Sequence, residues 1–400
     1  MQWVTDNDVP VPKHFRYARL ARIFTPRTPV AKRDRFAGRT AQVLDVLNAV
    51  AQPGTHVVLY GERGVGKTSL ANVLSEFVQP LWDDIGKTVR INCTTEDSYK
   101  TIWTRILDEM GIDTPENWAL GKADPDVVRR LLRDAKPSLL ILDEFDRVEN
   151  DEALSLMADT IKALSDHAVE TRLVIVGVAD SIDQLIGEHE SITRAIAEVQ
   201  LTRMTPDEAY QIIDTGLAEA GMSIDPVAHQ RIARLAEGLP HYVHLLCLES
   251  AQRAALDDRE RVSTDDVRSA IDNITKKHSL SREYQSAIQS PRQDTLFTRV
   301  LAACALADKN RLGYFTASAV RAPLSRIMMK PYDIPAFATH LKAFTGDGRG
   351  RVLQREGTER KYVYRFRNPL LQPFALLAAL SEGTIPADYV DEVLGHTDRN

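Results

Sequence analysis

Cysteine is scarce in this sequence, and the three that occur, Cys93, Cys247 and Cys304, are odd in number and far apart. This usage excludes a disulfide framework and a close-spaced thiolate metal site, and it predicts buried free thiols. No apolar run reaches the roughly 18 to 20 residues of a membrane span, and no apolar stretch precedes a small-residue cleavage site near the first residue. We therefore expect a cytoplasmic chain that does not enter a membrane.

Neither sign of charge dominates overall, because the formal net charge is −6 over 400 residues. The distribution is nevertheless uneven. Residues 1–40 carry 9 basic and 3 acidic side chains, residues 41–280 carry 24 and 41, and residues 281–400 carry 17 and 12. Basic ends around an acidic middle are typical of contact with nucleic acid or between domains, and also of ordinary solvated faces.

The length favours two or three domains, and the spacing of apolar residues divides the chain. Residues 1–35 form a proline-containing basic arm with a short helical pattern from Phe15 to Ile23. Residues 36–203 alternate short apolar runs with helical patterns, which predicts an α/β fold with a parallel sheet covered by helices on both faces. Its expected strands are 56–60, 88–92, 138–142 and 173–178.

The remainder has a different pattern. Residues 204–280 show helical periodicity throughout, with capping signals at 205–208 and 263–266, and predict an all-helical lid. Within residues 281–400, expected helices over 294–307, 316–320 and 334–345 precede two expected strands over 352–356 and 361–366. Three helices followed by a hairpin predict a C-terminal winged-helix domain.

A glycine-rich segment between the first expected strand and a helix carries the strongest chemical signal. Gly61-Glu62-Arg63-Gly64-Val65-Gly66-Lys67-Thr68 fits the G-x-x-x-x-G-K-[ST] pattern. The glycines let backbone N–H groups turn toward phosphates, Lys67 neutralises the β- and γ-phosphates, and the Thr68 hydroxyl ligates Mg²⁺. We expect Gly61 to Ser69 to contact the phosphates of ATP.

Two carboxylates end the third expected strand, at Asp143 and Glu144. The carboxyl ends of parallel strands face the ligand crevice in sheets of this kind. Asp143 is expected to hold Mg²⁺, and Glu144 is expected to polarise the water that attacks the γ-phosphate.

Together these motifs and the helical segment after the sheet resemble the AAA+ ATPases over about residues 31–280. Phe36-Ala37-Gly38-Arg39 ahead of the first helix and the winged helix at residues 292–375 are similar to the initiator, origin-recognition-like branch. Bacterial transposition-adaptor ATPases and STAND-type signalling ATPases share much of the pattern.

The resemblance implies roles for further residues. Asp180 occupies the sensor-1 position, although it also fits an ordinary loop carboxylate. Arg194 lies where the family has an arginine finger that acts on a neighbour's nucleotide; Arg203 is the substitute, and an exposed arginine with no such role is the alternative. His241, in Gly238-Leu239-Pro240-His241, stands at the sensor-2 turn where initiators have arginine, and a mostly neutral histidine cannot replace a guanidinium.

Three functions remain open on the sequence alone. The first is an ATP-binding, slowly hydrolysing switch that forms homo-oligomers and contacts double-stranded DNA through the basic wing, where residues 281–371 carry 16 basic and 7 acidic side chains. The second is a STAND-like signalling or defence ATPase that recruits a separately encoded effector. The third is an adaptor that bridges a transposase and DNA through the basic arm.

Overall fold

The computed structural model describes residues 13–30, 36–81, 86–116, 118, 123–180, 182, 185, 190–289, 296–358 and 361–394. The chain divides into two compact units between Arg203 and Met204. The first unit spans residues 29–203, and the second joins residues 1–28 to residues 204–400.

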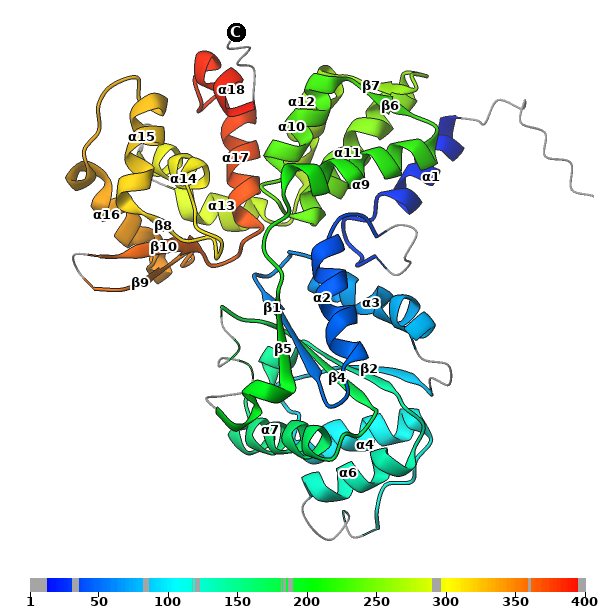
Figure 1. The fold of residues 1–400 in the computed structure, drawn as a ribbon. Coiled ribbons are helices and arrows are strands. Elements are labelled where there is room, and N and C mark those ends of the chain that lie inside the picture. The colour runs from blue at the N-terminus through cyan, green and yellow to red at the C-terminus, as the bar shows by residue number, and fades with distance from the viewer. Residues whose placement is uncertain are drawn as a thin grey trace, which may run out of the picture. The chain divides into compact units, whose positions relative to one another are not determined.

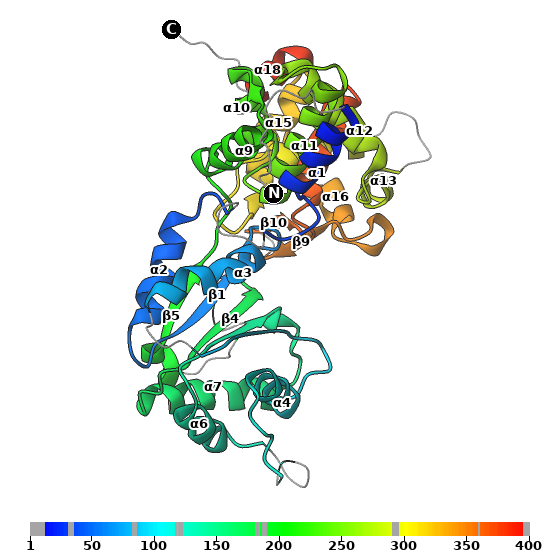
Figure 2. The same ribbon diagram turned by 90° about the vertical axis from the view of Figure 1, so that its right-hand side faces the viewer.

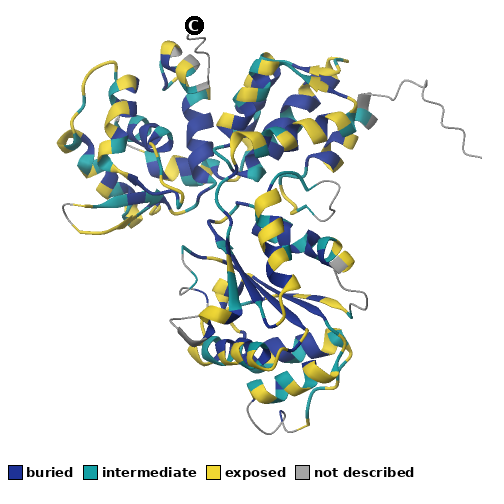
Figure 3. Cartoon of the chain, viewed as in Figure 1, coloured by how far each residue is buried: buried dark blue, intermediate teal, exposed yellow. Residues whose placement is uncertain are grey.

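A five-stranded parallel sheet lies at the centre of the first unit, with the strand order β2-β3-β4-β1-β5. All neighbouring strands run parallel, so their carboxyl ends share one edge. Val, Leu and Ile residues keep the central strands buried (Figure 3). The strands are β1 (His56–Gly61), β2 (Thr88–Asn92), β3 (Leu139–Asp143), β4 (Arg172–Val178) and β5 (Ile196–Gln200).

Helices cover both faces of this sheet, as the sequence predicts (Figures 1 and 2). On one face lie α2 (Thr40–Ala51) and α3 (Lys67–Val78). On the other face α4 (Tyr99–Met110), α6 (Pro125–Asp134) and α7 (Asp151–Asp166) share one buried apolar cluster with strand residues.

Five helices dominate the first part of the second unit: α1 (Lys13–Ile23), α9 (Pro206–Ala220), α10 (Pro226–Leu235), α11 (Pro240–Leu256) and α12 (Thr264–Lys277). The capping boxes at Thr205 and Ser263 form as predicted. A short parallel pairing of β6 (Ser223–Ile224) with β7 (Arg261–Val262), which the sequence did not suggest, joins two of the loops.

The described part of the basic arm, residues 13–30, packs through its helix against the helices of the second unit. Helix α1 packs against α9 and α11, and the Arg19 guanidinium donates to the Glu219 carbonyl at 2.7 Å. The ring of Phe24, which is fully buried, lies against Gly216 of α9.

The C-terminal part of this unit combines helices with a three-stranded antiparallel sheet of order β8-β10-β9. Its helices include α13 and α17, which the sequence analysis did not predict. The elements are α13 (Ser281–Ile288), α14 (Leu296–Leu306), β8 (Phe315–Thr316), α15 (Ala317–Ile327), α16 (Ile334–Phe344), β9 (Leu353–Glu356), β10 (Val363–Phe366), α17 (Leu371–Ser381) and α18 (Ala387–Leu394).

The three thiols are buried and free, as predicted. Burial raises the pKa of Cys93 to about 12, so it is protonated and unreactive at neutral pH. Among the described residues, no helix combines the length and the apolar character that crossing a membrane requires.

Candidate nucleotide site

The phosphate loop, Gly61 to Thr68, connects β1 to α3 in a conformation that depends on its glycines. Gly61, Gly64 and Gly66 have φ values of 149°, 89° and 102°, which L-residues rarely adopt. At Gly61 a Cβ atom would also lie 2.1 Å from the carbonyl oxygen of Leu201. The loop ends at the amino terminus of α3, whose partial positive charge favours anions.

Lys67, the first residue of α3, has its side chain inside the loop. Only 7% of the residue is exposed, and its Nζ donates to the carbonyl oxygens of Gly61 and Glu62, both at 2.9 Å. Burial lowers the pKa of Lys67 from 10.5 to about 8, while the nearby carboxylates of Asp146 and Asp143 act in the opposite direction. The carbonyls thus hold an ammonium where phosphate oxygens would be its stronger partners.

Asp143 ends β3 and is almost fully buried. Its Oδ2 accepts from the Arg90 guanidinium at 2.5 Å, and its Oδ1 accepts from the Glu144 backbone N–H at 2.9 Å. Arg90 comes from β2, the neighbouring strand. The carboxylate is therefore held in place by two hydrogen bonds, with the Arg90 cation beside it.

Glu144 adopts a left-handed backbone conformation, with φ 56°. Such a conformation is uncommon for a residue with a side chain, and residues that adopt it cluster at functional sites. Its side chain is 52% exposed and accepts from the Arg147 guanidinium at 2.9 Å. The carboxylate thus stands at the sheet edge and has a reversible, solvent-exposed partner.

A third carboxylate, Asp146, was missed by the sequence analysis. Its Oδ1 accepts from the Val178 backbone N–H at 2.8 Å and so links the segment after β3 to the end of β4. The signal in the sequence is a further acid, two residues after Glu144. Asp180, the predicted sensor-1 residue, is partly buried and follows β4 by two residues.

Three other residues that the sequence predicts to contact phosphates, Arg63, Thr68 and Ser69, lie in the loop or in the first turn of α3. Ser69 uses its Oγ to accept from the Val30 backbone N–H at 3.2 Å, and Asn72 donates to the Val30 carbonyl at 3.1 Å. Residue 30 is thereby fixed on α3. Arg63 is exposed, and Thr68 is partly buried in the first turn of α3.

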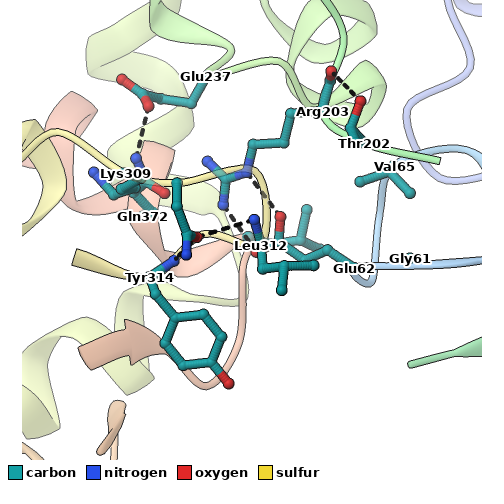
Figure 4. A network of polar contacts seen from close by, with 12 residues as sticks. Gly61, Glu62, Val65, Thr202, Arg203, Glu237, Lys309, Leu312, Tyr314 and Gln372 are labelled. Atoms are coloured by element: carbon teal, nitrogen blue, oxygen red, sulfur yellow. Dashed lines mark hydrogen bonds and ion pairs between the residues drawn. The ribbon is translucent and has the colours of Figure 1, made fainter. Parts of the chain in front are cut away.

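The two candidate finger arginines differ. Arg194 is exposed in the 3₁₀ turn Glu190–Ala195 that precedes β5. Arg203 instead forms a two-bond ion pair with Glu62 of the same chain, with N–O distances of 2.7 and 2.9 Å (Figure 4). The pairing shows that Arg203 already has an acidic partner within its own phosphate loop.

His241 belongs to the second unit, at the amino end of α11. Its Nδ1 lies 2.6 Å from the Pro26 carbonyl, and burial lowers its pKa, so the ring is neutral at pH 7. A neutral ring bound to the backbone cannot supply the positive charge of a sensor-2 arginine. A contact of His241 with nucleotide remains a prediction.

Several basic side chains near the hairpin β9–β10 have partners within the second unit. Arg351 donates to Asp347 at 2.8 Å, while the guanidinium groups of Arg355 and Arg365 lie 4.1 Å and 4.6 Å from the ring centroids of Tyr362 and Tyr314. Arg360 lies outside the described residues.

Comparison with known families finds a match to the family model described as an AAA domain over residues 51–186. No curated protein matches the chain. The matched segment contains the phosphate loop, Asp143 and Glu144.

Solved structures resemble nearly the whole chain at low sequence identity. Drosophila ORC, in a structure bound to DNA, is 14% identical, covers 94% of this chain and 95% of its own, and gives a TM-score of 0.50. The ORC2 protein of Aeropyrum pernix is 17% identical over 93% and 97%, with a TM-score of 0.49. RuvB of Thermotoga maritima, a Holliday junction branch migration motor, is 16% identical over 83% and 94%, with a TM-score of 0.43. Residues 51–186 therefore match the AAA domain family, and the fold of the chain is similar to that of Drosophila ORC.

Proposed function

We propose that this chain is a nucleotide-driven switch that binds and slowly hydrolyses ATP. The observation that carries the proposal is the buried ammonium of Lys67 inside a glycine loop, beside the strand-end carboxylates. The residues fit ATP and Mg²⁺, because the loop offers a compact cationic cradle and Asp143 offers an anchored carboxylate.

Each residue has a defined task in this proposal. Lys67 binds phosphate, while Thr68 and Asp143 hold Mg²⁺, which would neutralise charge on the phosphates when bound. Glu144 orients the attacking water, and Asp180 assists it. Arg194 of a neighbouring copy acts as the finger in a homo-oligomer, so turnover per chain should rise with protein concentration.

Replacing Glu144 with glutamine tests the catalytic assignment. The amide keeps the size of the side chain but cannot accept a proton or orient water as a carboxylate does. We expect ATP binding to persist while hydrolysis slows by about a hundredfold or more. Phosphate release under single-turnover conditions measures this, and an unchanged rate would transfer the catalytic role to another residue.

We further infer that the C-terminal module is a winged helix that contacts duplex DNA. The order α14, β8, α15, α16, β9, β10 supports this inference, and in a winged helix α16 would enter the major groove. Helix α16 offers only Thr339, His340 and Lys342 as polar readers, so phosphate contact by basic side chains is favoured over base readout. The structure of Drosophila ORC bound to DNA supports this inference.

DNA binding can be tested by fluorescence anisotropy with ATP present and salt varied. Log affinity should fall linearly with log salt, and the slope should shrink by about one for each phosphate-contacting arginine replaced among Arg351, Arg355, Arg360 and Arg365. The matched control is Arg268→Ala, which removes an exposed arginine of α12. No binding at low salt would contradict the DNA proposal.

One observation favours the second candidate, a signalling ATPase with a structural winged helix. The turn that contains Gly238 is bound to the C-terminal module. Gln372 donates to Glu237 at 2.6 Å (Figure 4). Tyr242 donates to the Leu370 carbonyl at 2.7 Å. Through such contacts, a change in the conformation of the turn would reach the C-terminal module directly. Absence of DNA binding in the anisotropy experiment would favour this candidate.

A further inference from the structure

Glu62 places a carboxylate within a loop that is built to receive phosphates. Its side chain is 8% exposed, and both of its oxygens accept from Arg203, whose side chain is 17% exposed. Two parallel N–H···O bonds fix the planes of both groups, and a buried carboxylate without such a partner is strongly disfavoured. Arg203 therefore neutralises Glu62 and sets the direction of its side chain.

The backbone of the same residue is bound to Lys67. The carbonyl oxygens of Gly61 and Glu62 accept from the Lys67 ammonium, and both bonds are buried. Phosphate oxygens are stronger partners for an ammonium than carbonyls, so an arriving phosphate draws Lys67 away from these oxygens. Glu62 is thus the residue through which occupancy of the loop can reach Arg203.

Arg203 stands where the chain passes from the first unit to the second. Just before it, the Leu201 backbone N–H donates to the Tyr60 carbonyl at 2.8 Å, and the Leu201 carbonyl lies against Gly61. Just after it, the Met204 backbone N–H donates to the Gly238 carbonyl of the second unit at 2.8 Å. The residues just before Met204 therefore bond to the strand and loop of the first unit, and Met204 itself bonds to the turn that precedes α11 within the second unit.

We propose that Arg203 is a positioning residue that, through Glu62, couples the state of the phosphate loop to the joint between the two units. It acts within its own chain, because its guanidinium holds both oxygens of Glu62. The inference rests on the proposed function, in which this loop binds ATP. Movement of the joint would then follow from nucleotide binding before any hydrolysis.

Distance measurement between spin labels in the two units tests this coupling. Labels are placed at Lys162→Cys and Arg253→Cys, both exposed, and the buried native thiols leave these as the reactive sites. In the parent, saturating Mg-ATP should shift the distance distribution. Arg203→Ala should lose most of that shift while its ATP affinity stays within about tenfold of the parent, because Arg203 acts through Glu62.

Two further variants make the test specific. Glu62→Gln keeps the shape of the side chain but weakens the pair, and at saturating ATP it should lose the shift as well. Arg105→Ala breaks a comparable pair, Arg105 to Asp97 at 2.7 Å, elsewhere in the first unit and should keep the shift.

The outcomes separate the coupling from the proposed function. A parent that does not bind ATP would contradict the proposed function. A parent that binds ATP without a shift, or an Arg203→Ala variant that shifts like the parent, would overturn the coupling alone. Loss of ATP binding in Arg203→Ala would also overturn it, because Arg203 would then be a phosphate ligand.

Discussion

Lys67 combines burial with positive charge, and its surroundings explain how it can stay charged. Desolvation disfavours the ammonium, whereas the Gly61 and Glu62 carbonyls and the Asp143 and Asp146 carboxylates favour it. The balance leaves its pKa at about 8, close enough to neutrality for its protonation to respond to a ligand.

This pKa predicts the pH dependence of nucleotide binding. Below pH 8 the free protein already carries the Lys67 proton, so ATP affinity should be nearly flat with pH. Above pH 8 the free side chain loses its proton, and phosphate binding must restore it, so affinity should fall by up to about tenfold per pH unit. Calorimetry in buffers of different ionisation enthalpy should detect proton uptake at pH 9, and an affinity that rises between pH 8 and 9 would contradict the assignment.

At the scale of elements, the packing of the basic arm depends on one glycine. A Cβ at Gly216 would lie 2.4 and 2.5 Å from Cε1 and Cζ of Phe24. Alanine would add about 1 kcal/mol of helix propensity, but overpacking a filled core typically costs about 1 to 3 kcal/mol. We therefore expect Gly216→Ala to lower the midpoint of denaturant unfolding.

The same change should be tolerated once the ring is smaller. In a Phe24→Leu background, adding Gly216→Ala should cost less than it does in the parent, because leucine can leave room for the methyl group. Equal costs in the two backgrounds would show that α1 and Phe24 do not pack on α9 as described.

Two elements that the sequence analysis did not predict, β5 and α17, contain polar residues or a proline that interrupt their local pattern. In β5 the polar residues Glu198 and Gln200 interrupt the apolar pattern, which an edge strand with one neighbour tolerates. Helix α17 contains Pro373, which lies in the first turn, where its missing N–H has no intrahelical partner to lose. The formation of β5 and α17 therefore depends on their positions in the folded chain, which the local sequence pattern does not reveal.

At the scale of the whole molecule, the predictable part of the site is the part that is contiguous in sequence. In the loop from Gly61 to Thr68, the spacing of the glycines in the sequence predicts where the backbone takes positive φ values. Asp143 and Glu144 are likewise predictable, because they come at the end of an apolar strand. The pair of Glu62 with Arg203 joins residues that are 141 positions apart, so no local pattern could reveal it. It follows instead from the close approach of Gly61 to the backbone at Leu201.

The most direct measurement of whether this molecule is a nucleotide switch is a calorimetric titration of Mg-ATP into the parent and Lys67→Ala. Loss of a buried charge-assisted contact to phosphate costs about 3 kcal/mol, so Lys67→Ala should bind at least roughly a hundredfold more weakly. Lys162→Ala, which removes an exposed lysine of α7, should bind like the parent. A parent that takes up no ATP, or a Lys67→Ala variant with unchanged affinity, would contradict the assignment of the phosphate loop.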